Sequence, residues 1–84
     1  MSGFGQDKAI DSLKTVLGSD MPDSARVFTL LDLSSQYYRT QPEEARRLAL
    51  EARELAEKAE NKSGLAPAYK AIGMSYYFQN NWID

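Results

Sequence analysis

The chain has 84 residues, 43% of them hydrophobic and 26% charged, and its formal net charge at pH 7 is −2. This composition is ordinary for one small globular domain, and it offers neither the basic excess typical of nucleic-acid binding nor an acidic tail. Cysteine and histidine are absent, which excludes disulfides and thiolate metal sites and removes the commonest general base and metal ligand. No apolar run approaches the roughly 18 residues that a membrane-spanning helix needs.

The first predicted helix covers about residues 7–17. Its apolar side chains recur at steps of three and four residues, which return to one face of a helix. These side chains are Ile10, Leu13 and Leu17. Gly18 is expected to end the helix.

The second predicted helix covers about residues 21–39. Asp20 is its expected N-cap, with Pro22 in the first turn and Asp23 three residues on, a pattern that resembles a capping box. Its apolar stripe comprises Val27, Leu30, Leu33 and Tyr37. The sequence "TQP" ends it, because a residue before proline avoids the helical conformation.

Two further helices are predicted at about residues 42–60 and 64–79, with "ENKSG" between them. Pro42 suits the first position of a helix, and Ser63 is expected to cap the fourth helix, with Pro67 in its first turn. The third helix carries opposite charges four residues apart, which favour a solvated face. The pairs are Glu43 with Arg47, Arg47 with Glu51, Arg53 with Glu57, and Glu54 with Lys58.

The second and fourth predicted helices contain related sequences. "LLDLSSQYYRTQ" and "YKAIGMSYYFQN" align with a constant offset of 39 residues, from 30 to 69 and from 37 to 76. Both carry a large residue, an aliphatic, a small residue and a tyrosine at steps of three, one and three. This pattern resembles the tetratricopeptide repeat, a helix pair written W-x2-L-G-x2-Y and then A-x3-F.

The resemblance implies an all-α, α-solenoid fragment of about four antiparallel helices. Residues 1–20 would be a tail and a short capping helix, 21–62 the first repeat, and 63–84 the first helix of a truncated second repeat. Ala49 departs from the family, which usually has an aromatic residue there. The positions expected to pack the repeats are Leu30, Leu33, Ser34, Tyr37, Ala45, Ala52, Tyr69, Ile72, Gly73 and Tyr76.

Two small residues have a specific role in this interpretation. Ser34 and Gly73 would lie where the paired helices of one repeat cross, so a larger side chain should separate the helices. Glycine inside a helix costs roughly 1 kcal/mol relative to alanine, and a close approach of another backbone would account for Gly73.

By the same resemblance, a concave groove would bind a protein or peptide segment. Its candidate residues are Phe28, Leu31, Ser35, Tyr38, Arg39, Lys70, Met74, Tyr77 and Phe78. Aromatic residues, Met and Arg are enriched at protein interfaces, although a neighbouring repeat could also cover these side chains. Lys70 sits where some family members hold a peptide carboxylate, but Met74 replaces the asparagine those members use, which argues against that ligand.

No catalytic constellation is expected. Ser34 and Ser35 have no histidine to activate them, and Glu43 and Glu44 point in diverging directions on a helix. The N-terminal "GFG" lacks a preceding strand, so it is not a phosphate-binding loop. The aspartates at 7, 11, 20 and 23 lack the spacing of a calcium loop. The chain is therefore predicted to be a non-enzyme without cofactor or metal.

The leading prediction is a non-catalytic scaffold for protein–protein interaction. A weaker resemblance, of "QDKAIDSLKTVL" and the segment that follows, is to the repeat arrays of bacterial sensor histidine kinases and nucleotide cyclases, which implies a signalling input region as an alternative. An inert helical spacer is a third. The N-terminal "MSGFGQ" lacks the features of a signal peptide, and the compartment stays open between the cytoplasm and the periplasmic part of a membrane-anchored protein.

The end of the sequence leads to one more expectation. "NNWID" matches the family's turn between helices, so the chain is expected to be part of a longer protein. A fourth helix without its partner would expose a stripe of Tyr69, Ile72, Tyr76 and Trp82. Two copies are expected to cover that stripe as a homodimer, either face to face or by exchanging the fourth helix across "ENKSG".

Overall fold

The computed structural model describes residues 3–81, and the side chains of residues 8–80. This part of the chain forms four α-helices and contains no strand, so the predicted all-α class is confirmed. The helices are α1 (Gly3–Leu17), α2 (Asp23–Gln36), α3 (Pro42–Lys58) and α4 (Lys62–Asn81).

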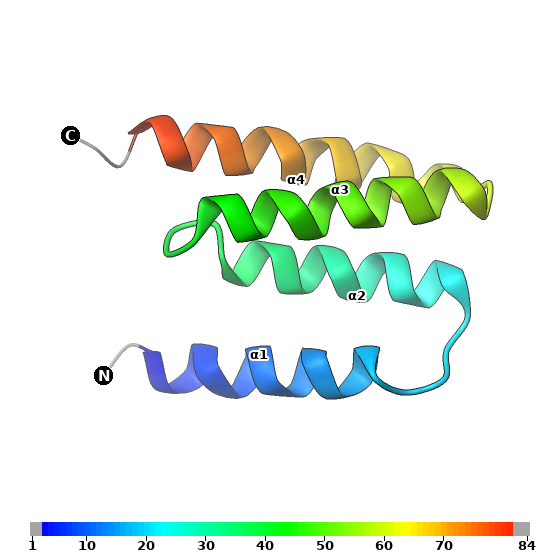
Figure 1. Ribbon diagram of the computed structural model, residues 1–84, viewed down its shortest axis with the longest axis horizontal. Coiled ribbons are helices and arrows are strands. Elements are labelled where there is room, and N and C mark those ends of the chain that lie inside the picture. The colour runs from blue at the N-terminus through cyan, green and yellow to red at the C-terminus, as the bar shows by residue number, and fades with distance from the viewer. Residues whose placement is uncertain (1–2, 82–84) are drawn as a thin grey trace.

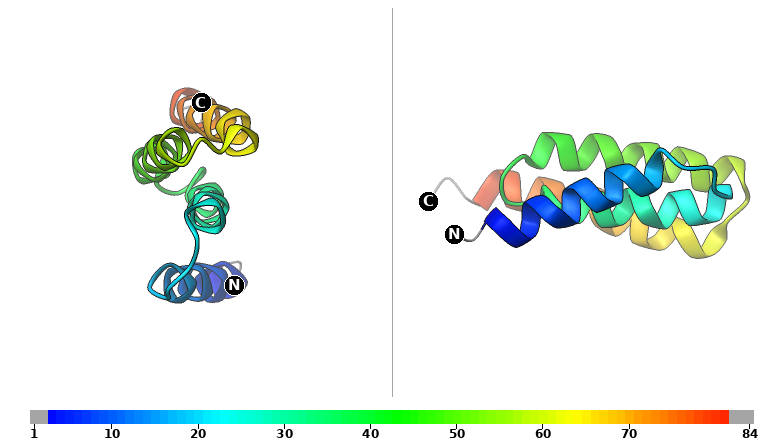
Figure 2. Two further views of the ribbon diagram at one scale, coloured as in Figure 1. Left: turned by 90° about the vertical axis from the view of Figure 1, so that its right-hand side faces the viewer. Right: turned by 90° about the horizontal axis from the view of Figure 1, so that it is seen from below.

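Helices that follow one another in the sequence lie side by side and run in opposite directions (Figure 1). Seen end-on, α2, α3 and α4 form a triangle, while α1 lies apart beneath α2 (Figure 2). At the level of the backbone, α2 contacts the three other helices, whereas α1 contacts α2 alone. The molecule measures 39 × 25 × 15 Å along its principal axes, so its core is thin.

Alanine makes up half of the buried apolar core. Ala45, Ala49, Ala52 and Ala56 are fully buried on α3, and α4 contributes Ala68 and Ala71. The larger core side chains come mainly from α2 and are Val27, Leu30, Leu31, Leu33 and Tyr37, with Leu48 from α3. Because an alanine side chain ends at Cβ, these residues allow the backbone of α3 to approach both neighbouring helices closely.

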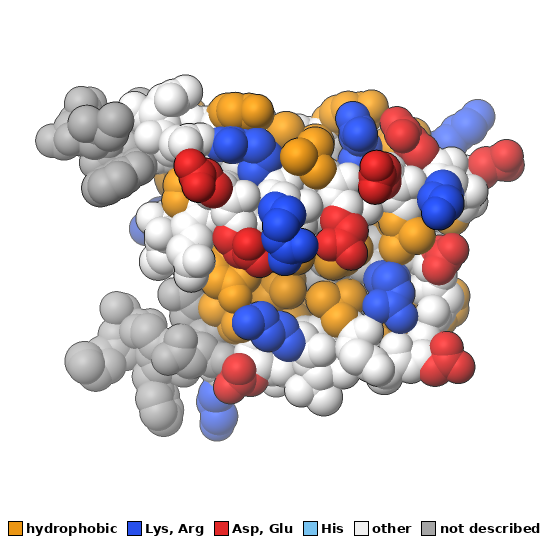
Figure 3. All heavy atoms as spheres, viewed as in Figure 1, with side chains coloured by type: hydrophobic (Ala, Val, Ile, Leu, Met, Phe, Trp, Pro, Cys, Tyr) orange, Lys and Arg blue, Asp and Glu red, His pale blue; other side chains and the backbone are white. Residues whose placement is uncertain are grey.

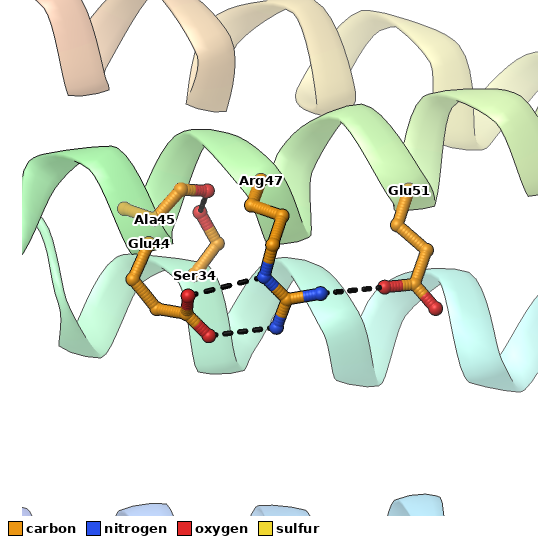
Figure 4. Close-up of polar contacts among 5 residues, drawn as sticks. All are labelled: Ser34, Glu44, Ala45, Arg47 and Glu51. Carbon is orange, nitrogen blue, oxygen red and sulfur yellow. Dashed lines mark hydrogen bonds and ion pairs between the residues drawn. The ribbon is translucent and has the colours of Figure 1, made fainter.

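Ser34 lies at the crossing of α2 and α3, as predicted. It is fully buried, and its Oγ donates a 2.7 Å hydrogen bond to the backbone carbonyl of Ala45 on α3 (Figure 4). The bond satisfies a polar group that would be costly to bury alone. A small side chain is therefore required here both for its volume and for its donor.

The prediction of a capping box at the start of α2 is wrong. The N-cap is Pro22, without a side-chain hydrogen bond, and Asp20 lies outside the helix. Arg26 makes the connection instead. Its guanidinium donates to the carbonyls of Leu17, at 2.8 Å, and of Ser19, at 3.3 Å, where a cation is favoured by the helix dipole.

The turn between α2 and α3 forms earlier than predicted. Helix α2 ends at Gln36 rather than near Arg39, because the N–H of Tyr37 bonds to the carbonyl of Ser34, one residue short of the α-helical partner. Pro42 occupies the first turn of α3, as predicted.

The turn between α3 and α4 is closed by a left-handed residue. Glu60 has φ 55°, its N–H bonds to Glu57 O, and the N–H of Asn61 bonds to Ala56 O at 2.8 Å. This is the Schellman arrangement, in which glycine is the usual left-handed residue. Helix α4 then begins at Lys62, so Ser63 is not its cap.

The prediction of which face of α4 is buried is wrong. Tyr69 and Tyr76 are 53% and 50% exposed, and apart from the adjoining backbone of α4 no described heavy atom lies within 4 Å of a Cβ placed on Gly73. The residues that α4 buries are Ala68, Ala71 and Ser75, with Ile72 half-buried against the core. Within the described residues, α4 packs only against α2 and α3, so the face assigned to a paired helix has no neighbouring helix.

The two small positions of the repeat should therefore respond oppositely to the same substitution. Ser34→Leu overpacks a buried crossing and removes a hydrogen bond, which should lower the free energy of unfolding by about 1–3 kcal/mol or more. Gly73→Leu places its Cβ in open space and removes a helical glycine, which should raise the free energy of unfolding by up to about 1 kcal/mol. Thermal unfolding followed by circular dichroism at low micromolar protein measures both. Destabilisation by Gly73→Leu would contradict the open face.

The left-handed residue gives a second prediction. Glu60→Gly removes the steric cost of a side chain in this conformation and should stabilise the fold by about 1 kcal/mol. Glu54→Gly, in the exposed interior of α3, is the matched control and should destabilise by a similar amount. Equal destabilisation of both variants in urea unfolding would show that residue 60 is not held left-handed.

Candidate functional site

A hollow of about 450 Å³ lies where the C-terminal end of α2 faces α4. The end of α2 and the turn after it supply Ser35, Gln36, Tyr38, Arg39 and Thr40, and α4 supplies Met74 and Phe78. We call this hollow the α2–α4 groove. Its volume is within the range of ligand-binding clefts, which is about 300–1,000 Å³.

An aromatic cluster forms one wall of the groove. The rings of Tyr38 and Phe78 are stacked with centroids 5.7 Å apart, and Tyr77 meets Phe78 edge-on at 5.3 Å. The guanidinium carbon of Arg39 lies 5.8 Å from the centroid of Phe78, within the range of a cation–π contact. Phe78 is therefore the centre of the cluster, since three neighbours hold its ring.

The groove offers a cation and a neutral hydroxyl. Burial raises the pKa of Tyr38 above its usual value, so the phenol keeps its proton at neutral pH and can donate a hydrogen bond. Arg39 is exposed, and the described structure records no carboxylate paired with it. An anionic group of a ligand could approach that guanidinium without displacing an internal ion pair.

The structure brings together most of the residues predicted for a groove. Five of them line the hollow: Ser35, Tyr38, Arg39, Met74 and Phe78. Tyr77, which is 57% exposed, joins through its contact with Phe78. Their role in binding stays a prediction.

Three predicted groove residues lie elsewhere. Leu31 is buried in the core, and Phe28 and Lys70 are exposed but do not line the hollow. Gln36 and Thr40 also line the hollow and were not among the predicted residues. They reach the hollow because α2 ends at Gln36, earlier than predicted, so the residues at this end lie near α4.

The opposite side of α4 is joined to α3 through Arg46. Its guanidinium lies over the ring of Tyr76, 3.8 Å from the centroid, and donates to Ser75 Oγ at 3.2 Å and to the Gln79 side-chain oxygen. One arginine thus fixes the rotation of α4 against α3. No feature of the sequence pattern predicted these contacts.

A second hollow, of about 720 Å³, surrounds the turn between α2 and α3 and shares Arg39 and Thr40 with the groove. Two of its charged lining residues, Glu44 and Arg47, are paired, whereas Arg39 and Glu43 make no ion pair among the described residues. Arg47 donates to both carboxylate oxygens of Glu44, at 2.7 and 3.1 Å, and lies 3.6 Å from Glu51 (Figure 4). Of the predicted pairs of α3, Arg47 with Glu51 forms, whereas Arg47 chooses Glu44 over Glu43.

A third hollow, of about 360 Å³, lies between α1 and the α2–α3 pair. Its apolar lining consists of Leu17, Leu30, Leu33 and Leu48. Apolar side chains gather over α2 in the space-filling view, between charged side chains on α1 and α3 (Figure 3). The hollow reflects the separation of α1 from α3, which do not touch at the backbone level.

Among residues 3–81, no group of three or more acidic side chains is placed to hold a metal ion. Within the same residues, no helix has the combination of length and apolar character needed to cross a membrane. The α2–α4 groove is thus the candidate site with the most specific geometry. Comparisons with protein-family models, with curated proteins and with solved structures gave no match.

The Glu44 and Arg47 pair predicts a small dependence of stability on pH. The hydrogen bond from Arg47 lowers the pKa of Glu44 in the folded chain. A lowered folded pKa contributes stability that is present above the unfolded pKa and is lost as the pH falls through the folded value. Because the Arg47 side chain is 61% exposed, the contribution should be below about 1 kcal/mol.

Glu44→Gln should therefore be slightly less stable than the parent chain at neutral pH, and the difference should vanish in acid. Urea unfolding at several pH values measures it. Glu54→Gln, on the same helix and without a recorded ion pair, is the control and should show no such dependence. A difference that grows in acid would contradict the assignment.

Proposed function

We propose that this chain is a non-catalytic scaffold of tetratricopeptide-like helix pairs that binds a segment of another protein in the α2–α4 groove. The observation that carries the proposal is the cluster of Tyr38, Tyr77 and Phe78 with Arg39 beside a hollow. Large aromatic side chains and arginine dominate the energetics of protein interfaces. Their rings are already held in place by one another, which lowers the entropic cost of binding.

The arrangement of the helices supports the repeat interpretation. Helices α2 and α3 form an antiparallel pair, and α4 packs against both, as the next repeat would. Ser34, Ala45 and Ala52, to which the repeat interpretation assigns close packing, are buried, which supports the proposal. Stacked helix pairs produce a concave surface that binds without any reactive group.

The chemistry of the groove defines the segment it fits. Met74 and Phe78 would take an apolar side chain, and Met adapts its shape to different partners. Arg39, on the same wall, would favour a carboxylate near that side chain. The proposed ligand is therefore a short peptide segment with an apolar anchor followed or preceded by an acidic residue.

Selection from a displayed library of random peptides tests the proposal with the 84-residue chain as target. Enriched peptides should carry an apolar residue close to Asp or Glu. In fluorescence anisotropy, Phe78→Ala should weaken their binding about tenfold or more, as expected for a central interface residue. Helical circular dichroism should be retained, because Phe78 lies at the surface of the groove.

Two variants sharpen the test. Tyr69→Ala, an equally large truncation on the other side of α4, is the control and should leave binding unchanged. Arg39→Gln should remove the preference for acidic peptides while keeping the apolar anchor. Failure to enrich any peptide would favour an inert spacer, and peptides that bind Phe78→Ala as well as the parent chain would place the site elsewhere.

A further inference from the structure

The side of α4 that faces away from the groove carries an uncharged stripe with the spacing of a helix-pairing seam. All of its members are exposed, and they follow one another at steps of three, four, three and four residues: Ala66, Tyr69, Gly73, Tyr76 and Asn80. Alternation of three and four residues is the spacing at which two helices pack along their length. We call this surface the α4 seam.

No other helix packs along the α4 seam among the described residues, although the guanidinium of Arg46 covers one face of the Tyr76 ring. Tyr69 and Tyr76 expose about half of their surface, and a Cβ at Gly73 would meet no described atom within 4 Å outside the adjoining backbone of α4. Leu50 of α3, which is 39% exposed, adds to the uncovered apolar surface of the α3–α4 hairpin. The two tyrosines of the seam therefore project from α4, and Gly73 leaves a notch between them.

The order of residues in the seam is nearly the same in both directions. Reading outward from Gly73, each side presents a tyrosine and then an uncharged residue, Ala66 on one side and Asn80 on the other. In an antiparallel pair of α4 helices related by a two-fold axis at Gly73, Tyr69 of one copy would lie about 1.5 Å along the axis from Tyr76 of the other, given a rise of about 1.5 Å per residue. We propose that the α4 seam binds a second copy of this chain in this way.

The available area suits a weak dimer. Helix α4 has 20 residues, so it is about 30 Å long, and a face two helices wide measures about 20 Å across. The product of this length and width is about 600 Å² per copy, or about 1,200 Å² in total, which equals the lower limit for a specific interface. Association is therefore expected in the micromolar range rather than below it.

A second copy accounts for the symmetry of the seam, which an unrelated partner would not require. A two-fold contact places the same patch on both subunits, so each seam residue must pack against the residue that the axis brings opposite it. The seam also lies on a different side of α4 from Met74 and Phe78. Tyr77 borders both surfaces, but Met74 and Phe78 are not part of the seam, so the dimer and the groove can each fail without the other.

Sedimentation equilibrium over a range of concentrations tests the proposal. The parent chain should show a reversible monomer–dimer equilibrium. Gly73→Leu fills the notch without disturbing the monomer, and it should weaken association at least about tenfold, which corresponds to about 1.4 kcal/mol. Ser12→Leu, which adds the same side chain to an exposed position of α1, is the control and should associate like the parent chain.

The orientation can be tested by disulfide trapping, because the chain contains no cysteine. Tyr69→Cys mixed with Tyr76→Cys should yield a crosslinked heterodimer on oxidation. Tyr69→Cys alone should not crosslink, because its two copies would be about 12 Å apart along the axis, beyond the Cα separation of about 4.4–6.8 Å in disulfides.

A chain that stays monomeric at all concentrations would overturn the proposal. So would a dimer that Gly73→Leu leaves intact, including one that exchanges α4 across the turn at Glu60. Efficient crosslinking of Tyr69→Cys to itself would show a different orientation and would overturn the antiparallel seam.

Discussion

The close contact of α3 with its neighbours is the constraint on which the rest of the structure depends. Four fully buried alanines on α3 keep most of its inner face small, so the helices approach closely, and the Ser34 hydrogen bond joins α2 to α3 at their crossing. The thin core then places α4 within reach of the end of α2, which creates the groove. A larger side chain at any of these alanines would shift the walls of the groove as well as the core.

Helix α4 serves two surfaces because only one side of it is buried. Met74 and Phe78 face the end of α2, Ala68, Ala71 and Ser75 face the core, and the two tyrosines of the seam face solvent. Arg46 holds this rotation through Tyr76, Ser75 and Gln79. A modest turn of α4 about its axis would exchange these environments, so Arg46, which borders the seam at Tyr76, influences both surfaces.

The four helices could be predicted because their apolar periodicity and their proline and glycine breaks are strong local signals. The ends of the helices were harder to predict. Asp20 has the right side chain for a cap, but Arg26 bonds across the turn instead. Glu60 adopts a left-handed conformation that glycine usually occupies. The internal repeat identified the buried Ser34 correctly. It misplaced Gly73, because burial depends on which helices are present and not on sequence spacing alone; the glycine in close contact is Gly64, whose Cβ would lie 2.9 Å from Val27. Most of the candidate groove followed from the pattern, whereas the contacts of Arg46 required coordinates.

The start of α1 and the end of α4 lie at the same end of the molecule (Figure 1). A mechanical load applied between these two points would act across the helices rather than along them. It would break the contacts between neighbouring helices one after another, starting at that end, instead of shearing them all at once. Helix α1, which touches α2 alone at the backbone level, would detach first, and the α2–α3–α4 triangle would remain as the mechanically resistant unit.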